Sequence, residues 1–239
     1  MFGSGGSCVT DPNRALFESV VCLLGPVLDE LVFVGGCTTG LFLTDLAAGG
    51  IRPTKDVDAI VEANSYGEYL SLAEKLRALG LAEDTTPGAP LCRWRRDDII
   101  VDIMPMDASV LGFSNRWYST GFETAQTRRI AGHDVRIVTP TLFIATKLVA
   151  FHGRGGGDVF ASHDLEDIVT VVDGRPEIVE EVADADAQVR SFISSEIRSL
   201  LDNPDFVDAL PGLLPPDASS QARQRILGER LRALSESCP

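Results

Sequence analysis

A short apolar run that ends in two glycines constrains this chain more than any other feature. Residues 32–36 read VFVGG, a helix-like segment follows, and a second apolar run over residues 56–61 carries Asp56 and Asp58. Alternate residues of a strand point to the same face, so both carboxylates are predicted to face one spot. We therefore expect a strand, a helix over residues 38–48 and a second strand, with paired acids at its start.

The chemistry of these residues indicates an anion held beside a metal. Paired carboxylates offer the oxygen ligands that Mg²⁺ prefers and often shares with substrate phosphates. Gly35 and Gly36 have no side chains, so a triphosphate could approach the backbone closely. The expected helix would direct its free N–H groups at the same anion. Together these features predict a metal-dependent nucleotide site.

A third acid, Asp102, lies in the apolar run IIVDIMP over residues 99–105. A charge in so apolar a strand is costly unless it is paired or bound to metal. The alternative for Asp56 and Asp58 is a solvated edge strand, and Asp102 could likewise face solvent beside the acidic turn that precedes it. The glycine pair upstream and Asp102 downstream favour the metal site.

Two further residues are candidates on local grounds. Lys147 lies within an apolar helix predicted over residues 139–152 and needs an anionic partner if it is buried. The alternative is a lysine that extends its side chain to solvent. Asp164 lies at the start of another predicted helix, where acids are favoured without any function.

The only concentrated basic region of the sequence lies on two neighbouring predicted hairpins. A groove for an RNA end is one interpretation, with Trp94 as a stacking platform for bases. Ordinary solvated strand faces are the alternative. The arginines of this region are Arg93, Arg95, Arg96, Arg128, Arg129 and Arg136.

Composition narrows the function classes. The chain has 239 residues, is 44% hydrophobic and carries a net charge of −14. This charge argues against a broad phosphate-binding surface and against binding to anionic membranes. No apolar run reaches the roughly 18 residues of a membrane helix, and the N-terminus lacks the pattern of a signal peptide. A cytoplasmic protein is expected.

The five cysteines are scattered and form no Cys-x-x-Cys pair, which favours reduced thiols over disulfides or a zinc site. Cys37 lies at a predicted helix start, where the pKa of a thiol is lowered. It is therefore expected to react faster than Cys22. The order of elements predicts an α+β fold, with a mixed β-sheet core in residues 1–140 and a helical C-terminal part in residues 141–239 that completes the active site.

The order of glycine pair, helix, Asp-x-Asp and a later lone aspartate resembles the nucleotidyltransferase superfamily of the DNA polymerase β type. The form RPTKDVD over residues 52–58 looks like the branch of AbiEii-type toxin nucleotidyltransferases. The resemblance covers roughly residues 30–170. It implies that Asp56 and Asp58 bind two metal ions and that Asp102 binds the catalytic one.

The AbiEii-like branch adds a lysine on a helix and a later acidic motif. Lys147 fits the lysine, and SHDLEDI over residues 162–168 makes Asp164 the leading acid and Asp167 the runner-up. The nucleotide-binding residues that the resemblance implies are Gly35, Gly36, Thr38, Thr54, Lys55 and Lys147. The chain departs from the compact pattern in its long spacing from Gly36 to Asp56, and in Cys37, where a small hydroxyl residue is common.

The resemblance implies an enzyme that moves a nucleoside monophosphate from an NTP to an acceptor hydroxyl with Mg²⁺ (or Mn²⁺). The expected acceptor is an RNA or tRNA 3′ end or a protein side chain, and an antitoxin is a possible partner. Two alternatives remain open at the level of sequence. One is a nucleotide-binding regulator without turnover, and the other is a glycosyltransferase whose Asp-x-Asp holds the metal of a sugar nucleotide.

Overall fold

The computed structural model describes residues 11–45, 47–153 and 157–237. The chain divides into two compact units. The sheet unit comprises Asn13–Thr38 and Pro53–Val149, and the helical unit comprises Met1–Pro12, Thr39–Arg52 and Ala150–Pro239. The predicted division into a core of residues 1–140 and a helical part of residues 141–239 stays a prediction. Each compact unit is described by itself.

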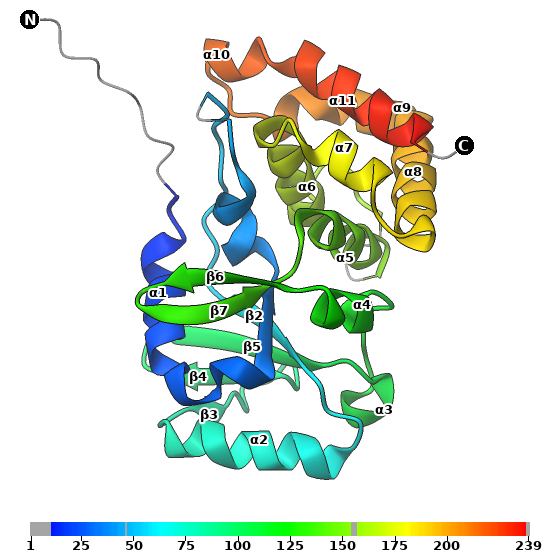
Figure 1. The fold of residues 1–239 in the computed structure, drawn as a ribbon. Coiled ribbons are helices and arrows are strands. Elements are labelled where there is room, and N and C mark those ends of the chain that lie inside the picture. Colours follow the sequence, from blue (N-terminus) through cyan, green and yellow to red (C-terminus); the bar gives the residue numbers. More distant parts are fainter. Residues whose placement is uncertain (1–10, 46, 154–156, 238–239) are drawn as a thin grey trace, which may run out of the picture. The chain divides into compact units, whose positions relative to one another are not determined.

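The sheet unit is built on a seven-stranded mixed sheet with the strand order β3-β4-β5-β2-β1-β7-β6 (Figure 1). Strand β1 pairs antiparallel with β2 and parallel with β7, while β2 pairs parallel with β5. This mixed sheet with flanking helices confirms the predicted α+β class. The strands are β1 (Leu31–Val34), β2 (Val57–Val61), β3 (Ala82–Glu83), β4 (Arg93–Arg96), β5 (Ile99–Pro105), β6 (Gln126–Ile130) and β7 (His133–Ile137).

Helix α1 (Arg14–Leu23) buries Phe17, Val20 and Val21 at helical spacing. A 3₁₀ helix, η1 (Gly25–Glu30), begins at Gly25-Pro26 directly after α1. Asn13 precedes the first turn of α1. The other helices that begin in this unit are α2 (Tyr66–Ala78), α3 (Ala108–Leu111), α4 (Tyr118–Glu123) and α5 (Pro140–Gly153).

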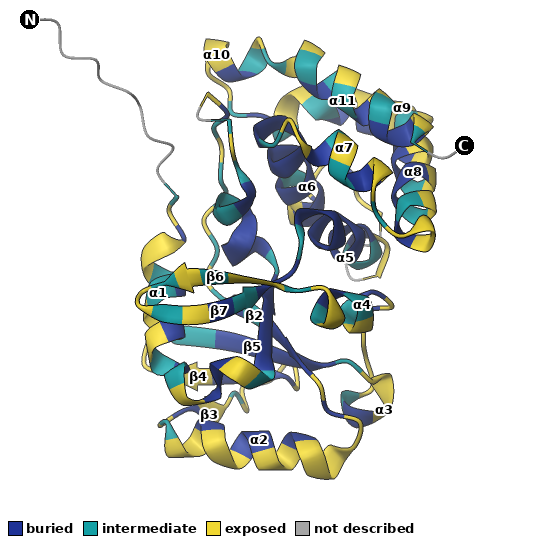
Figure 2. Cartoon of the chain, in the orientation of Figure 1, coloured by how far each residue is buried: buried dark blue, intermediate teal, exposed yellow. Residues whose placement is uncertain are grey.

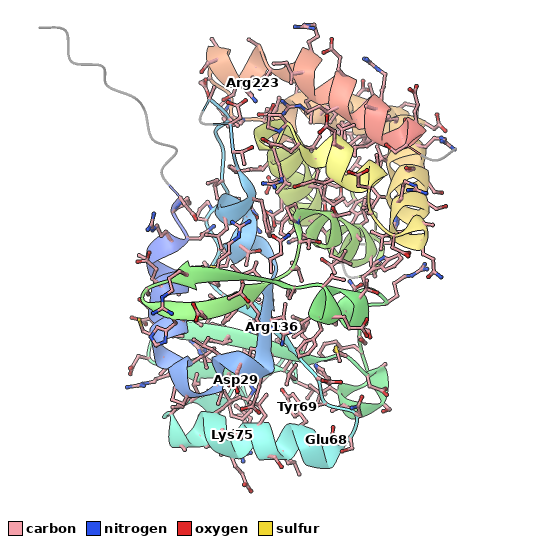
Figure 3. All side chains as sticks on the ribbon, in the orientation of Figure 1. Asp29, Glu68, Tyr69, Lys75, Arg136 and Arg223 are labelled. Carbon is pink, nitrogen blue, oxygen red and sulfur yellow. The ribbon has the colours of Figure 1, made fainter. Side chains whose placement is uncertain are left out.

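Helix α2 begins where the Ser65 hydroxyl accepts a hydrogen bond from the N–H of Glu68, a good N-cap. One face is buried and the other is exposed, as the two colours along this helix show (Figure 2). Tyr69, on the buried face, donates from its hydroxyl to the carbonyl of Ile103 on β5 (Figure 3). This bond fixes α2 against the sheet.

The helical unit gathers its buried surface around α6, which is almost wholly buried (Figure 2). The Ser162 hydroxyl caps α6 by accepting from the N–H of Leu165. Arg223, which is labelled in Figure 3, links two parts of this unit by donating hydrogen bonds to Asp173 of α6 and to Asp45. Its helices are α6 (His163–Gly174), α7 (Ile178–Ala183), α8 (Ala187–Leu201), α9 (Pro204–Ala209), η3 (Leu210–Leu213), α10 (Ala218–Gln221) and α11 (Gln224–Glu236).

The predicted helix over residues 38–48 is wrong. A 3₁₀ helix, η2 (Gly36–Phe42), occupies the first part, and the described residues after it are not helical. The N–H groups of Thr44 and Asp45 donate to the carbonyl of Gly174, so they are not available for a helix of their own. This segment is therefore shaped by its packing in the helical unit.

Two separate helices, α7 and α8, follow one another over residues 178–201. Asp186 accepts from the N–H of Gln188 and caps α8, so the chain restarts there after α7. Within the described part of the chain, no helix is long and apolar enough to span a membrane.

Candidate active site

Three aspartates are brought together by the register of two strands. Asp58 on β2 lies directly opposite Asp102 on β5, and the strands are parallel. Residues opposite each other in a sheet point to the same face, so the two carboxylates are neighbours. Asp56 comes one residue before β2 and is held to the same cluster by the contacts described below. We call Asp56, Asp58 and Asp102 the aspartate cluster.

Gly35 is required by the position of Asp58. Its φ of +75° lies in the left-handed region, and a Cβ added there would stand 2.0 Å from Oδ2 of Asp58. Only glycine fits, because any side chain would displace the carboxylate. The sequence predicted that a phosphate approaches this backbone, and the structure shows that a carboxylate of the cluster does so.

Thr38 closes the loop that carries Gly35. Both its N–H and its hydroxyl donate to the carbonyl of Gly35, at 3.1 and 2.8 Å. The side chain is fully buried. In this conformation Thr38 shapes the loop with its hydroxyl. A contact between that hydroxyl and a nucleotide remains a prediction.

Thr54 orients Asp56. Its hydroxyl donates to Oδ1 of Asp56 at 2.8 Å, and its backbone N–H donates to the side-chain oxygen of Asn13 at 2.8 Å. Asn13 is 1% exposed and was not among the residues selected from the sequence. A lone asparagine before a helix carries no signal for such a role. Lys55, next to Thr54, is exposed.

Arg93 joins two members of the aspartate cluster. Its Nε donates to Oδ1 of Asp102 at 2.8 Å, and its Nη2 donates to Oδ2 of Asp102 at 2.7 Å and to Oδ2 of Asp56 at 3.0 Å. The carboxylate of Asp102 is the main cause of a raised pKa of Arg93. The alternative of an ordinary solvated strand face is therefore wrong for Arg93, whereas a place in an RNA groove stays a prediction.

Trp94 cannot serve as a base-stacking platform in this conformation. It is 1% exposed, and its indole N–H lies 3.5 Å from the hydroxyl of Tyr69. Successive strand residues face opposite sides, so Trp94 points away from the face on which Arg93 meets the aspartates. The predicted role of Trp94 as a stacking platform for bases is therefore wrong, and the RNA groove itself stays a prediction.

The prediction that Cys37 reacts faster than Cys22 is also contradicted. Cys37 is buried while Cys22 is exposed. A third thiol, that of Cys92, has a pKa raised to about 12, first by burial and then by the negative charges of Asp102 and Asp58. The electrostatic field of the aspartate cluster therefore acts on the neighbouring Cys92. The same negative field would attract a cation to the cluster.

Lys147 lies on α5 and is 5% exposed. Its ammonium nitrogen lies 5.9 Å from the centre of the Phe143 ring, within reach of a cation–π contact. The alternative of a lysine extended into solvent is therefore excluded for this conformation. Lys147 belongs to the sheet unit, as do all three residues of the aspartate cluster.

Asp164 and Asp167 both belong to α6 of the helical unit and are buried. Asp167 is 1% exposed and forms an ion pair with Arg52, whose Nη2 lies 3.2 Å from Oδ2 of Asp167. Arg52 is the first residue of the RPTKDVD pattern, and this pairing gives its charge a structural role. Asp164 remains the leading candidate for the acid of the second motif.

Among the residues that the structure describes, no three acidic, histidine or cysteine side chains stand in a ready metal-binding arrangement. The guanidinium of Arg93 instead bonds to two of the three aspartates. The carboxylates of the cluster are suitable ligands for a divalent cation. In this structure the guanidinium of Arg93 sets the geometry of Asp56 and Asp102.

No protein-family model matches the sequence, and no curated protein matches it. Solved structures with a similar fold include an antigenic nucleotidyltransferase-like protein from Paracoccidioides brasiliensis, with 17% identity, 85% of this chain and 94% of that chain covered, and a TM-score of 0.49. The antibiotic-resistance factor ANT(2'')-Ia follows with 15% identity, 79% and 95% coverage and a TM-score of 0.48. JHP933 from Helicobacter pylori has 12% identity, 95% and 94% coverage and a TM-score of 0.49. At such values, these similarities do not by themselves assign a function to this chain.

Proposed function

We propose that this chain is a metal-dependent nucleotidyltransferase that moves a nucleoside monophosphate from an NTP to an acceptor hydroxyl. One observation carries the proposal. The register that sets Asp58 opposite Asp102 gathers three carboxylates beside a glycine turn that tolerates no side chain. Such a group of acids on adjacent strands is costly without a cation, and a function that uses a cation accounts for it.

The chemistry of the donors fits Mg²⁺ or Mn²⁺. Asp56, Asp58 and Asp102 offer carboxylate oxygens, which hard divalent cations prefer. The bonds from Arg93 to two of them indicate that this cluster requires a positive charge. When bound, the metal ions would favour loss of the proton from the acceptor hydroxyl and neutralise charge on the phosphates.

The residues of the chain would divide the remaining work. Asp56, held by the hydroxyl of Thr54, and Asp58, held against Gly35, would fix the metal-bound triphosphate. Asp102 would accept the proton of the acceptor hydroxyl. Lys147, a buried ammonium, would neutralise the triphosphate.

Two groups of residues have supporting parts in the proposal. Gly36 and Thr38 would shape the phosphate loop, with Lys55 at its exposed edge. Asp164 would act as the acid of the second motif, a role carried over from the AbiEii-like resemblance.

The proposed acceptor is an RNA or tRNA 3′ end or a protein side chain, and the proposed context is a toxin with a neutralising antitoxin. The RPTKDVD form of residues 52–58 supports this choice through its resemblance to AbiEii-type toxins. A net charge of −14 is unfavourable for long contacts along a nucleic acid backbone, so the acceptor would be held over a short length.

The test is incubation of the full chain with Mg²⁺ and each α-³²P-labelled NTP, in the presence of total RNA or total protein, followed by gel analysis. We expect label on one class of acceptor and none with Asp58→Asn. Parallel reactions with labelled UDP-sugars test the glycosyltransferase alternative. Transfer from a UDP-sugar, or nucleotide binding without transfer to either class, would replace the proposed function by one of its alternatives.

A further inference from the structure

Arg93 uses its guanidinium in a way that a solvated surface arginine does not. Its Nε and Nη2 each donate a hydrogen bond to one oxygen of Asp102, at 2.8 and 2.7 Å. Nη2 also donates to Oδ2 of Asp56 at 3.0 Å. The side chain of Asp102 is only 9% exposed. A fork-shaped bidentate bond to a nearly buried carboxylate is among the stronger side-chain contacts in proteins.

The two aspartates that Arg93 grips are also two of the three proposed metal ligands. Both oxygens of Asp102 accept from Arg93, so the guanidinium already uses lone pairs and negative charge that a metal ion would also use. Two cations within a few ångströms also repel each other, strongly so where solvent is excluded. The guanidinium and a divalent ion therefore compete for the oxygens and the negative charge of Asp56 and Asp102.

The strand that carries Arg93 allows the exchange. The backbone of Arg93 is fixed by bonds to Pro90 and Asp84 on its outer side, at 3.0 and 2.9 Å. Its side chain is 23% exposed, so the guanidinium has access to water. Arg93 can therefore release the carboxylates by rotation of its side chain, without movement of β4.

We propose that Arg93 is a built-in competitor of the metal, which neutralises Asp56 and Asp102 in the metal-free chain and must leave them when the metal binds. This inference rests on the proposed function for the identity of the metal ligands. It goes further by making metal affinity depend on an arginine that is not itself a ligand. Metal binding should accordingly be weak before the triphosphate arrives, because the metal alone has to displace a protein cation.

The test measures Mn²⁺ alone, without nucleotide, by titration calorimetry and by the spin-resonance signal of free Mn²⁺. Arg93→Met keeps an unbranched side chain and removes the charge, so it should bind Mn²⁺ at least about tenfold more tightly than the unaltered chain. Arg93→Lys keeps the charge but loses the fork and should lie between them. Arg95→Met is the matched control, since Arg95 lies two residues along β4 and contacts Asp84, at 3.6 Å, outside the cluster.

Adding Asp102→Asn to Arg93→Met should abolish the gain in Mn²⁺ affinity. This result would show that the gain arises at the aspartate cluster. If Arg93→Met does not fold, Arg93→Lys carries the test. Affinity equal to or below that of the unaltered chain in the folded Arg93 variants would overturn the proposal and leave Arg93 as a residue that positions Asp102. If the unaltered chain transfers nucleotide but the Arg93 variants show no gain in Mn²⁺ affinity, only the competition by Arg93 is refuted. If the variants gain Mn²⁺ affinity but the unaltered chain transfers nucleotide from no NTP, only the proposed function is refuted.

Discussion

Asp102 is the only member of the aspartate cluster that comes from β5, and this position separates binding from chemistry. Asp102→Asn keeps the shape of the side chain but removes its charge and its ability to accept a proton. Loss of such a proton acceptor typically lowers a rate by about 10²–10⁴-fold. We expect binding of Mg²⁺-NTP within a few-fold of the unaltered chain, and transfer reduced by at least about 100-fold.

Titration calorimetry and single-turnover transfer of labelled nucleotide measure the two quantities separately. Asp58→Asn should lose both, while Asp98→Asn, at an exposed position in the same hairpin, should lose neither. Near-normal transfer by Asp102→Asn would remove Asp102 from the chemistry.

The described thiols should differ sharply in reactivity. Cys22 is exposed, whereas Cys37 and Cys92 are buried. Burial and the nearby aspartates raise the pKa of Cys92 to about 12, so its thiolate stays scarce up to about pH 10. Iodoacetamide at pH 8 should therefore label Cys22 at least about tenfold faster than Cys92, as mass spectrometry of the digested chain would show. Fast labelling of Cys92 in the folded chain would contradict its burial.

Arg93 shows how far the sequence could have led at this scale. The prediction of a hairpin around Asp97-Asp98 was correct, and a two-residue turn sets Arg93 opposite Asp102. Their pairing could therefore have been read from the sequence. A single basic patch does not describe these arginines, because alternate residues of a strand face opposite sides and Arg93 lies opposite an aspartate.

At the scale of elements, the loop from β1 to η2 is the most constrained. Gly35→Ala places a Cβ 2.0 Å from Oδ2 of Asp58 in a backbone conformation that favours glycine, so we expect loss of stability and of Mg²⁺-NTP binding together. Gly132→Ala is the matched control, because Gly132 has a φ of +82° with nothing within 4 Å of the added Cβ.

The control should cost only the backbone term, about 1–2 kcal/mol, and leave binding intact. Urea unfolding and calorimetry of both variants provide the comparison. Equal effects of the two changes would show that the contact with Asp58 is unimportant.

Elements with a strong apolar period were predictable, and elements shaped by distant partners were not. The buried face of α2 and the apolar strand β5 follow from their own residues. The segment after Phe42 does not, because its N–H groups bond to Gly174, far along the chain. The same limit applies to the site: the aspartates were visible as a pattern, but Asn13 and its bond to Thr54 depend on a contact 41 residues apart.

At the scale of the whole molecule, Arg223 ties α6 to the segment from Thr39 to Arg52. It donates to Asp173, whose side chain is 2% exposed, and to Asp45. Arg223→Met would leave Asp173 buried without this partner, which typically costs about 3–5 kcal/mol. We expect a fall in melting temperature of roughly 10 °C.

Arg225→Met provides the control for the loss of a charge. Arg225 is exposed and pairs with Glu229 on the same helix, so its removal should change stability by less than about 0.5 kcal/mol. Calorimetric melting of the two variants would decide, and a similar small change in both would show that Arg223 does not stabilise the unit.

The chain passes between its two compact units after residues 12, 38, 52 and 149. Thr44 and Asp45 therefore leave the ribosome long before α6, whose Gly174 carbonyl accepts from their N–H groups, and before Arg223, which pairs with Asp45. In the sequence, the two stretches of the proposed nucleotide site, residues 35–38 and 54–58, precede and follow residues 39–52. The hydrogen bonds and the ion pair that hold Thr44 and Asp45 within the helical unit can therefore form only after α6 and Arg223 have been synthesised.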